Sequence, residues 1–547
     1  MAKNIIWRCI ALVVTFLLGL LFNWLMLPAW NFRNPGLWGF LIMMVAIGAL
    51  FQWIVDFIVC YDSDIEFLGI KIGGIALCVF VLILAIGALT SWQLFSARKY
   101  QQIVTIEEGI FDEDINHVDN VNNISIVDLG TAERLGDRTI GSIPNSSWYE
   151  VDNEYDLINY QGEQYRISPL NYGGLFKFNK AKYDGIPGYV LVNTLTQEAR
   201  YVQLEKGIKY SPSAYWSFDL KRHIRGQYPN DRLGKFQFEI DEAGTPYWVT
   251  PVRTATVGMF GCIKETSFII TNACTGESQK YRTEELPGWV DHAYSLEYLM
   301  RAAKYNLSYV NGIWNSWFAK TGVMKTSYEY RHNGGEDEVP FAGYNTTITS
   351  NGDIVYYAGL TPASNAETNV GFLLLNPRTG VIKRYNCSGA EESSAQAAAE
   401  SLVQDLKYEA TFPTMLNVEG EETYFMLLKD KAGLVQRYAL CNVENYTKVV
   451  QAQTLEEAVN QYLIKLGQET VQESQKQSAQ GQISELYEAQ IDGCTFYYFK
   501  IEGSTNLYMS SIKNSNKQVM LKVGTEVSIE YVPSTEDGVF IVQKISF

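Results

Sequence analysis

The sequence predicts an α+β protein. It should begin with an anchor of three transmembrane helices, continue with duplicated modules of a helix and an antiparallel sheet, and end in a small β-barrel. Apolar stretches fill the first hundred residues, strand–turn–strand patterns recur between helices in the middle, and short alternating strands occupy the last segment. The chain has 547 residues, so several domains are expected, because one domain usually spans about 100–200 residues.

The N-terminal part of the chain is predicted to cross a membrane three times. Its apolar stretches cover about residues 10–27, 37–59 and 68–92. Each is close to the about 20 residues with which a helix crosses about 30 Å of hydrocarbon, and only helices satisfy their own backbone hydrogen bonds there. No small-residue cleavage site follows the first stretch, so we expect it to be retained rather than removed as a signal peptide.

Asp56 is an ionisable residue within the second apolar stretch. Such a residue indicates a transport pathway or a contact between helices. Asp56 also lies near the end of its stretch, from where a carboxylate can reach the water of the headgroup layer. The sequence favours this last interpretation and leaves the helix contact open.

Charge does not decide the orientation in the membrane. An odd number of spans places the chain ends on opposite sides, and the flanking basic residues are balanced. They are Lys3, Arg8 and Lys71 on one side and Arg33, Arg98 and Lys99 on the other. The large region after the spans is rich in Tyr and Trp, poor in His, and contains Asn-x-Ser/Thr triplets. These triplets begin at Asn123, Asn145, Asn306, Asn345, Asn386 and Asn445. We therefore expect a multi-pass protein of the cell membrane with an extracytoplasmic C-terminal region.

The composition argues against nucleic acid and metal ions as partners. The formal net charge is −16, and an acidic protein repels phosphate backbones. Neither C-x-x-C nor a paired histidine spacing occurs, so we predict no metal site and no cofactor. Cys262 and Cys274 could form a disulfide if they flank one hairpin, and two unlinked thiols are the favoured alternative.

A strand–turn–strand pattern recurs three times in the soluble region. In each copy an apolar strand ends at an Asn, a Thr follows three residues later, and a second strand leads to a Tyr. The three asparagines are Asn193, Asn272 and Asn376. Asn favours such turns because its side chain can bond the backbone two residues further on. The pattern therefore predicts three β-hairpins.

A longer unit recurs twice and predicts an internal duplication. Residues 213–227 and 393–407 each read as a helix, followed by a Pro, a strand, an acidic turn with Gly and an aromatic strand. We therefore predict two α+β modules. The predicted domains are a transmembrane region 1–97, an acidic linker and lead-in segment 98–175, a first module 176–332, a second module 333–467, a linker 468–483 and a small β-barrel 484–547.

The last predicted domain has about five short alternating strands, with turns at Gly524 and Gly538. Its length suits a small barrel of the OB type. Such a shape does not by itself indicate a nucleic-acid partner, and this segment is not strongly basic.

Several blocks within residues 100–465 resemble an uncharacterised family of firmicute membrane proteins with short transmembrane anchors. The blocks are LGDR (135–138), GIPGY (185–189), FEID (238–241), GAEE (389–392) and ATFP (410–413). The helix–strand–hairpin unit with its Asn-x-x-Thr-Gly turn is similar to the PepSY-type modules of exported bacterial proteins. The resemblance implies a location and a PepSY-like fold, and it implies no activity.

Side chains with catalytic potential are few. Asp291 and His292 open a helix, and a His–Asp pair can act as a base, but adjacent helical positions do not face one another. Capping and packing are therefore favoured for this pair. Glu239 and Asp241 alternate on a strand and could do acid–base work, whereas the solvated edge of a hairpin explains them more simply. We predict no catalytic residue.

One basic cluster stands out in this acidic chain. Lys221, Arg222, His223 and Arg225 lie within one predicted helix. They could bind an anionic wall polymer or the acidic patch of a partner, and a solvated helix face is the simpler interpretation. Among exposed features this cluster is the first candidate for a binding site.

We expect a membrane-tethered binding or scaffold protein of the bacterial cell envelope, without catalysis. Its partners would be the lipid bilayer and an envelope protein or wall polymer. Two alternatives stay open: a PepSY-like regulator of a protease or other envelope enzyme, and a glycan-acting hydrolase whose acids converge only in the fold. A deep pocket with two facing carboxylates would favour the hydrolase.

Overall fold

The computed structural model of the chain describes residues 2–59, 68–115, 124–139, 141, 145–329, 343–364, 368–466, 477–491, 494–512, 516–533 and 538–547. Asn123 and residues 468–476 of the predicted linker lie outside these ranges.

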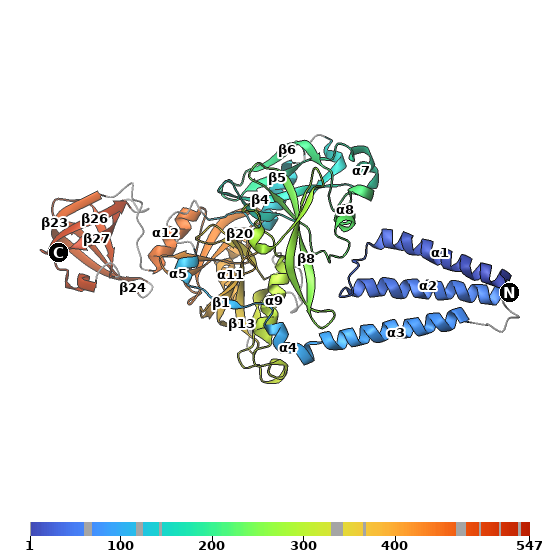
Figure 1. Cartoon of the computed structure of the whole chain (residues 1–547). Helices are drawn as coiled ribbons and strands as arrows, with labels where there is room; N and C mark the ends of the chain where they lie inside the picture. The colour runs from blue at the N-terminus through green and yellow to red at the C-terminus, as the bar shows by residue number, and fades with distance from the viewer. Residues whose placement is uncertain are drawn as a thin grey trace. The chain divides into compact units, whose positions relative to one another are not determined.

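Three long apolar helices form the N-terminal part of the molecule, which confirms the predicted helical stretches. They are α1 (Ala2–Met26), α2 (Pro35–Val59) and α3 (Leu68–Ser91). All three are long and apolar enough to cross a membrane. Figure 1 shows them side by side, with the N-terminus at the end that is remote from the β-sheets.

The chain divides into two compact units. Unit 1 comprises residues 1–114, 125–366 and 371–386, and unit 2 comprises residues 115–124, 367–370 and 387–547. The predicted boundary between the two modules, at residue 333, therefore falls inside unit 1. The three apolar helices also belong to unit 1.

In the part of the chain that the structure describes, four copies of a four-stranded antiparallel meander build most of the sheets, whereas the sequence predicted two modules. In each copy the strands pair in chain order. The first copy is β3 (Asp156–Tyr160), β4 (Glu163–Tyr172), β5 (Ile186–Asn193) and β6 (Ala199–Ile208). The second is β7 (Gln237–Ile240), β8 (Pro246–Val257), β9 (Gly261–Asn272) and β10 (Ser278–Tyr281). The third is β12 (Asn345–Ile348), β13 (Ile354–Pro362), β15 (Gly371–Leu375) and β16 (Ile382–Tyr385). The fourth, in unit 2, is β19 (Thr414–Val418), β20 (Glu421–Lys429), β21 (Val435–Asn442) and β22 (Val449–Ala452).

An asparagine begins the turn between the third and fourth strands of every copy. The Oδ1 atom of Asn193 accepts hydrogen bonds from the backbone N–H groups two and three residues on, both at 2.9 Å. Asn272 and Asn376 make the same two bonds. The three predicted hairpins are therefore confirmed. In the fourth copy Asn442 accepts from the residue three positions on, but that residue is Asn445 rather than a Thr, so the sequence pattern does not reveal this copy.

Helices accompany each meander along the chain. They are α8 (Leu220–Gln227), α9 (Leu296–Ser308), α11 (Glu392–Ser401) and α12 (Leu455–Leu466). The helix predicted over 213–227 begins later, because Asp219 caps α8: its side chain accepts from the N–H of Arg222 at 2.7 Å. The helix predicted over 393–407 likewise ends earlier, at Ser401.

Residues 98–175 hold regular structure and are not a plain linker. The elements include the end of α4 (Gln93–Gln101), β1 (Ile106–Glu108), α5 (Phe111–Asp114), α6 (Leu129–Thr139), β2 (Tyr149–Val151), β3 and β4. β1 pairs in parallel with β16 and so extends the third meander. An acidic segment without apolar alternation gives no strand signal, so this pairing is set by the neighbouring sheet rather than by local sequence.

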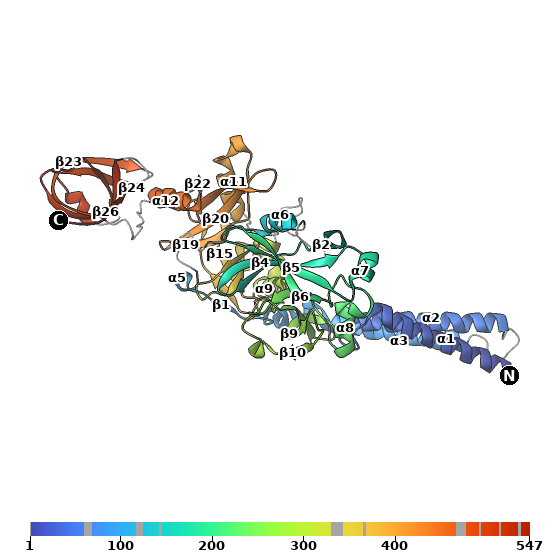
Figure 2. The ribbon, with the colours of Figure 1, turned by 90° about the horizontal axis from the view of Figure 1, so that it is seen from above.

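The C-terminal segment is a closed five-stranded β-barrel, which confirms the predicted barrel (Figure 2). Its strands are β23 (Gln477–Ile491), β24 (Cys494–Ile501), β25 (Leu507–Ser511), β26 (Glu526–Pro533) and β27 (Val539–Ser546). They follow the order β23-β24-β25-β27-β26, in which β25 and β27 run parallel. Phe499, Tyr508 and Val527 are among the buried side chains of its core.

Cys262 and Cys274 are both free thiols, the favoured alternative. They do not flank a hairpin. Cys262 lies near the start of β9 and Cys274 lies just beyond its end, so an extended strand of about 3.3 Å per residue holds them far apart.

Candidate functional site

A cavity of about 380 Å³ lies in unit 1 and is lined by residues of its three meanders and of the start of α9. Small-molecule sites usually have volumes of about 300–1,000 Å³. Most of the lining side chains are polar, charged or aromatic. The ones that matter for its chemistry are Asp156, Arg166, Lys235, His292, Tyr344 and Tyr356.

Arg166 on β4 places a buried cation in the wall of this cavity. Its Nε donates to the backbone oxygen of Val127 at 2.9 Å, and its Nη1 donates to that of Tyr155 at 3.1 Å. Burial lowers the pKa of the guanidinium, while the charges of Asp128 and Asp156 act in the opposite direction. Arginine stays protonated in proteins, so a positive charge that is bonded to neutral carbonyls lies in the cavity wall.

Asp156 lies on β3, the strand next to Arg166, and lines the same cavity. Its negative charge acts on Arg166, Lys235 and His292. None of the hydrogen bonds or ion pairs among the described residues involves this carboxylate. A half-buried carboxylate in a polar cavity can accept an N–H or O–H group of a ligand.

Two tyrosines contribute aromatic wall and neutral hydroxyl groups. The rings of Tyr344 and Tyr356 meet edge to face, with centroids 5.9 Å apart. Burial raises the pKa of both hydroxyls, and the charge of Asp156 raises it further. Both therefore remain protonated near neutral pH and can donate or accept a hydrogen bond.

Glu239 and His292 form a buried pair beside the cavity, with both side chains only 1% exposed. The Oε1 atom of Glu239 accepts from the backbone N–H of His292 at 2.6 Å and lies 3.2 Å from its Nδ1. Burial lowers the pKa of His292, but the hydrogen bond and the charge of Glu239 outweigh this effect and raise it to about 9. His292 is therefore an imidazolium in the cavity wall at neutral pH.

Glu239 and Asp241, the two carboxylates that alternate at the end of the predicted strand, do not share a site. Glu239 is buried against His292, whereas a solvated hairpin edge was the simpler prediction. The Oδ1 of Asp241 instead accepts from the N–H groups of Ala243 and Thr245, at 3.0 and 2.8 Å, and closes the turn between β7 and β8. Asp291 and His292 lie just before α9, where capping and packing were the favoured prediction. Their side chains serve packing contacts: Asp291 pairs with Arg378, and His292 with Glu239.

The predicted basic cluster lies on α8 and is used mainly in contacts within the chain. The guanidinium of Arg222 lies 4.1 Å from the ring centroid of Trp24. The Nε2 atom of His223 lies 2.6 Å from a backbone carbonyl oxygen, and the Nη1 atom of Arg225 donates to three backbone oxygens of the following loop. Lys221 is exposed. Binding of a wall polymer by this cluster stays a prediction, with Lys221 as its exposed member.

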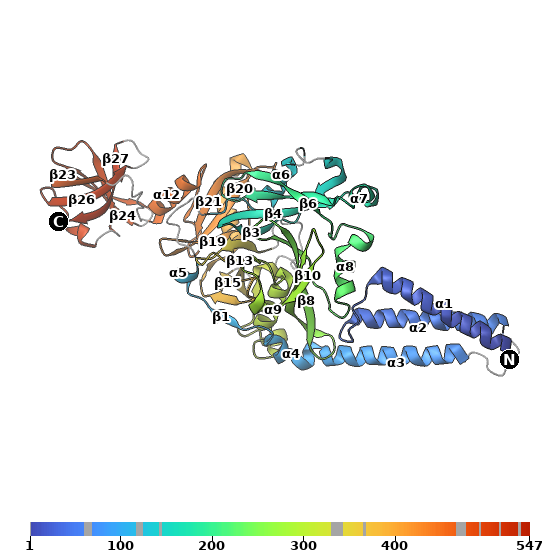
Figure 3. The same cartoon turned by 45° about the horizontal axis from the view of Figure 1, so that its top comes forward.

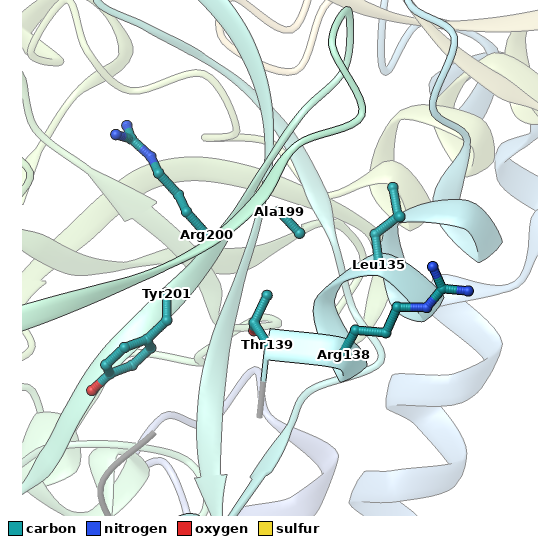
Figure 4. A pocket seen from close by; sticks show the side chains of 6 residues that line it. All are labelled: Leu135, Arg138, Thr139, Ala199, Arg200 and Tyr201. Carbon is teal, nitrogen blue, oxygen red and sulfur yellow. The ribbon is translucent and has the colours of Figure 1, made fainter. Parts of the chain in front are cut away.

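A second, open hollow lies between α6 and β6 (Figure 4). It is lined by Leu135, Arg138, Thr139, Ala199, Arg200 and Tyr201. Figure 4 shows the guanidinium groups of Arg138 and Arg200 pointing away from one another. Because the two cations do not converge, this hollow offers no charged site comparable to the cavity.

Sequence patterns did not single out Asp156, Arg166, Lys235 or the tyrosines of the cavity. They lie on different strands that only the fold brings together. Arg166 begins the buried stretch 166–170 of β4, which becomes evident only in the structure. A charged residue inside a buried strand needs a partner or a function.

No protein-family model and no curated protein matches the chain. Among solved structures, the chain is similar to Trypanosoma rangeli sialidase at 10% identity, over 72% of this chain and 54% of that one, with a TM-score of 0.17. It is also similar to the Trypanosoma rangeli sialidase complex with a difluorinated nononic acid at 10% identity, over 71% and 52%, with a TM-score of 0.16. The chain thus spans about half the length of these neighbours. Such TM-scores do not indicate a shared fold.

Proposed function

We propose that the protein is a membrane-tethered binding protein of the bacterial cell envelope, and that the cavity of unit 1 takes a small polar solute. The observation that carries this proposal is that a buried cation, Arg166, and a carboxylate, Asp156, line the same cavity from adjacent strands. A solute with an anionic group and a hydrogen-bond donor would satisfy both side chains. Free amino acids and the charged residues of wall polymers carry such groups.

Binding can be tested on the full-length protein in detergent. Thermal melting would be recorded with panels of amino acids, sugar acids and uncharged sugars, and hits would be measured by calorimetry. We expect stabilisation by zwitterionic or acidic solutes, because a ligand that binds only the folded state raises the melting temperature. Absence of any hit across the three panels would count against the proposal.

Asp156→Asn is the informative variant, since it removes the charge and keeps the shape of the side chain. It should weaken binding by about tenfold or more, because a charge-assisted hydrogen bond is worth about 1.5–3 kcal/mol. Asp405→Asn makes the same change at an exposed position outside the cavity and should leave binding unchanged. Equal affinities of the two variants for the solute would show that Asp156 does not contact it.

The glycan-hydrolase alternative needs two carboxylates that face one another across the bond to be cleaved. Of the carboxylates that line the cavity, Glu154 lies 2.8 Å from Lys235, and Glu297 lies 3.6 Å from Arg253. Asp156 is left without such a partner among the described residues. One available carboxylate favours binding over acid–base catalysis.

The extracytoplasmic location and the kinship with PepSY-type modules belong to the same proposal. Balanced basic residues on the two sides of the spans leave the orientation to experiment. A cysteine at exposed Lys221 (Lys221→Cys) should react with a membrane-impermeant maleimide on intact cells. If the cysteine reacted only after the cells were broken, the large region would face the cytosol. Its partners would then be cytosolic rather than envelope components.

A further inference from the structure

Within unit 1, the sheet region that follows the spans meets the three apolar helices through a set of close contacts. The Oγ atom of Ser91, at the end of α3, accepts from the N–H of Phe260 in the β8–β9 turn at 2.8 Å. The N–H of Trp30, just after α1, donates to the oxygen of Pro229 at 2.9 Å. Any membrane that the helices cross therefore ends close to the surface of unit 1 that surrounds these contacts.

An aromatic turn of unit 1 lies against the last turn of α1. The indole of Trp216 stacks on that of Trp24, with ring centroids 6.2 Å apart, and Trp216 remains 51% exposed. The φ angle of Trp216 is +60°, a backbone conformation that is strained for a bulky side chain. Strain of this kind persists where the surroundings impose it, and it often marks a functional position.

The short helix α7 (Leu175–Ala181) continues this surface. Phe178 on its inner side is fully buried and lies 5.4 Å, centroid to centroid, from the ring of Tyr215, the neighbour of Trp216. The outer side carries Phe176, which is 86% exposed, and Tyr183, just beyond the helix, which is 72% exposed. Exposed rings that gather on one face, next to Trp216 and the ends of the spans, mark a contact with a membrane or a partner.

The same segment is basic in an acidic protein. Residues 175–183 read LFKFNKAKY, with three lysines and no acid, while the whole chain has a net charge of −16. Lys177, Lys180 and Lys182 thus flank the two exposed rings. Aromatic side chains interleaved with lysines are typical of surfaces that sit at the headgroup level of anionic membranes.

The figures place the α7 segment at the height where the spans leave the sheet region. In Figures 1, 2 and 3, α7 and α8 lie at the end of unit 1 from which α1 and α2 extend. Other exposed rings at the ends of the spans are those of Trp30, Phe32, Trp92 and Phe95. Together with Phe176 and Trp216 they would form one aromatic belt, supplied partly by the spans and partly by the sheet region.

We infer that the α7 segment, residues 175–183, and Trp216 form a membrane-contact surface. Phe176 and Tyr183 insert among the headgroups of the leaflet next to unit 1, and the three lysines bind the phosphates of anionic phospholipids there. This contact would hold the sheet region of unit 1 on the bilayer, in addition to the anchoring by the three spans. The inference is independent of whether the cavity binds a ligand.

Photo-crosslinking of the full-length protein in lipid nanodiscs tests the insertion. Phe176→benzoylphenylalanine should give lipid adducts by mass spectrometry, as should Phe16→benzoylphenylalanine, which replaces an exposed ring within α1. Ile110→benzoylphenylalanine should give none, because this exposed residue precedes α5 at the opposite end of unit 1 (Figures 1 and 3). Adducts at position 16 but not at position 176 would overturn the inference.

The lipid charge is tested in discs of phosphatidylcholine with phosphatidylglycerol. Adducts at position 176 should be enriched about fivefold or more in phosphatidylglycerol over its share of the lipid, since one lysine near an anionic surface contributes about that factor. The triple variant Lys177→Gln/Lys180→Gln/Lys182→Gln should bring the ratio to that of the bulk lipid. An unchanged enrichment in the triple variant would refute recognition by the lysines.

Discussion

The carboxylate of Asp56 on α2 accepts a hydrogen bond from Nη2 of Arg8 on α1 at 2.7 Å. The Asp56 side chain is 2% exposed, so it does not reach headgroup water as the sequence favoured; it makes the helix contact that was left open. The amide of Gln52 adds a second link, since its Nε2 donates to the backbone oxygen of Arg8 at 3.1 Å. Polar groups in spans pair in this way because lipid offers them no alternative partner.

Replacing Asp56 by Ala should destabilise the contact between α1 and α2. Removing one member of a buried ion pair leaves the other charge uncompensated, at a cost of about 3 kcal/mol. Unfolding of the detergent-solubilised protein in increasing dodecyl sulfate would measure this loss. The double variant Arg8→Ala/Asp56→Ala should lose less than the two single changes added together. Strict additivity would mean that the two side chains do not interact.

The spans and the barrel could be predicted because their signals are local. A span needs only length and hydrophobicity, and the hairpins need only an Asn at the correct place, as at Asn272 and Asn376. The cavity could not be predicted, because Asp156, Gln237 and Tyr356 come from three separate meanders and acquire a common environment only in the fold. Of the four meanders, the last hairpin turn escaped prediction, since Asn442 keeps a turn hydrogen bond but lacks the Thr that lies three residues after the other asparagines.

Stability should fall as the pH rises from about 6.5 to 9 because of His292. Its pKa is raised to about 9 in the folded protein, against about 6.5 in an unfolded chain. The protonated form therefore stabilises the fold fully below about pH 6.5, and this contribution disappears as the pH passes 9. Burial also raises the pKa of Glu239, so its own contribution begins to fall already above the ordinary value of 4.5. Melting temperatures across this pH window would measure the loss, which we expect to reach about 2–3 kcal/mol.

Glu239→Gln is the matched variant for this experiment, since it keeps the shape and removes the charge. It should melt below the wild type at pH 6.5, and most of the decline between pH 6.5 and 9 should be absent. If the variant declined as steeply as the wild type, the pH dependence would have to come from another group.

Asp114, at the end of α5, should make the stability of the fold sensitive to acid. Burial raises the pKa of Asp114, but the hydrogen bonds from Lys383 at 2.6 Å and the Tyr385 hydroxyl at 2.7 Å outweigh it, and the net shift is downward. A lowered pKa stabilises the fold above the ordinary value of about 3.8, and this contribution is lost as the pH falls below it. Asp114→Asn should therefore cost about 1 kcal/mol at pH 7 and almost nothing at pH 3. Glu113→Gln, an exposed neighbour, should have no comparable effect at either pH, and an equal loss there would point to net charge rather than to the Asp114 contacts.

Gly258 in the β8–β9 turn decides how closely the second meander approaches α3. Its φ is +58°, and a Cβ atom there would lie 2.5 Å from the carbonyl carbon and oxygen of Thr90. Gly258→Ala therefore adds a backbone clash to the about 1–2 kcal/mol that a side chain costs at such a φ. The turn should move away from the helix, and a disulfide between Ser91→Cys and Phe260→Cys should form more slowly in the Gly258→Ala background.

Gly312→Ala supplies the comparison, because φ is +86° there but nothing lies within 4 Å of the added atom. It should lose only the strain energy and leave the disulfide rate unchanged, whereas equal losses in the two variants would show that the turn does not press against α3.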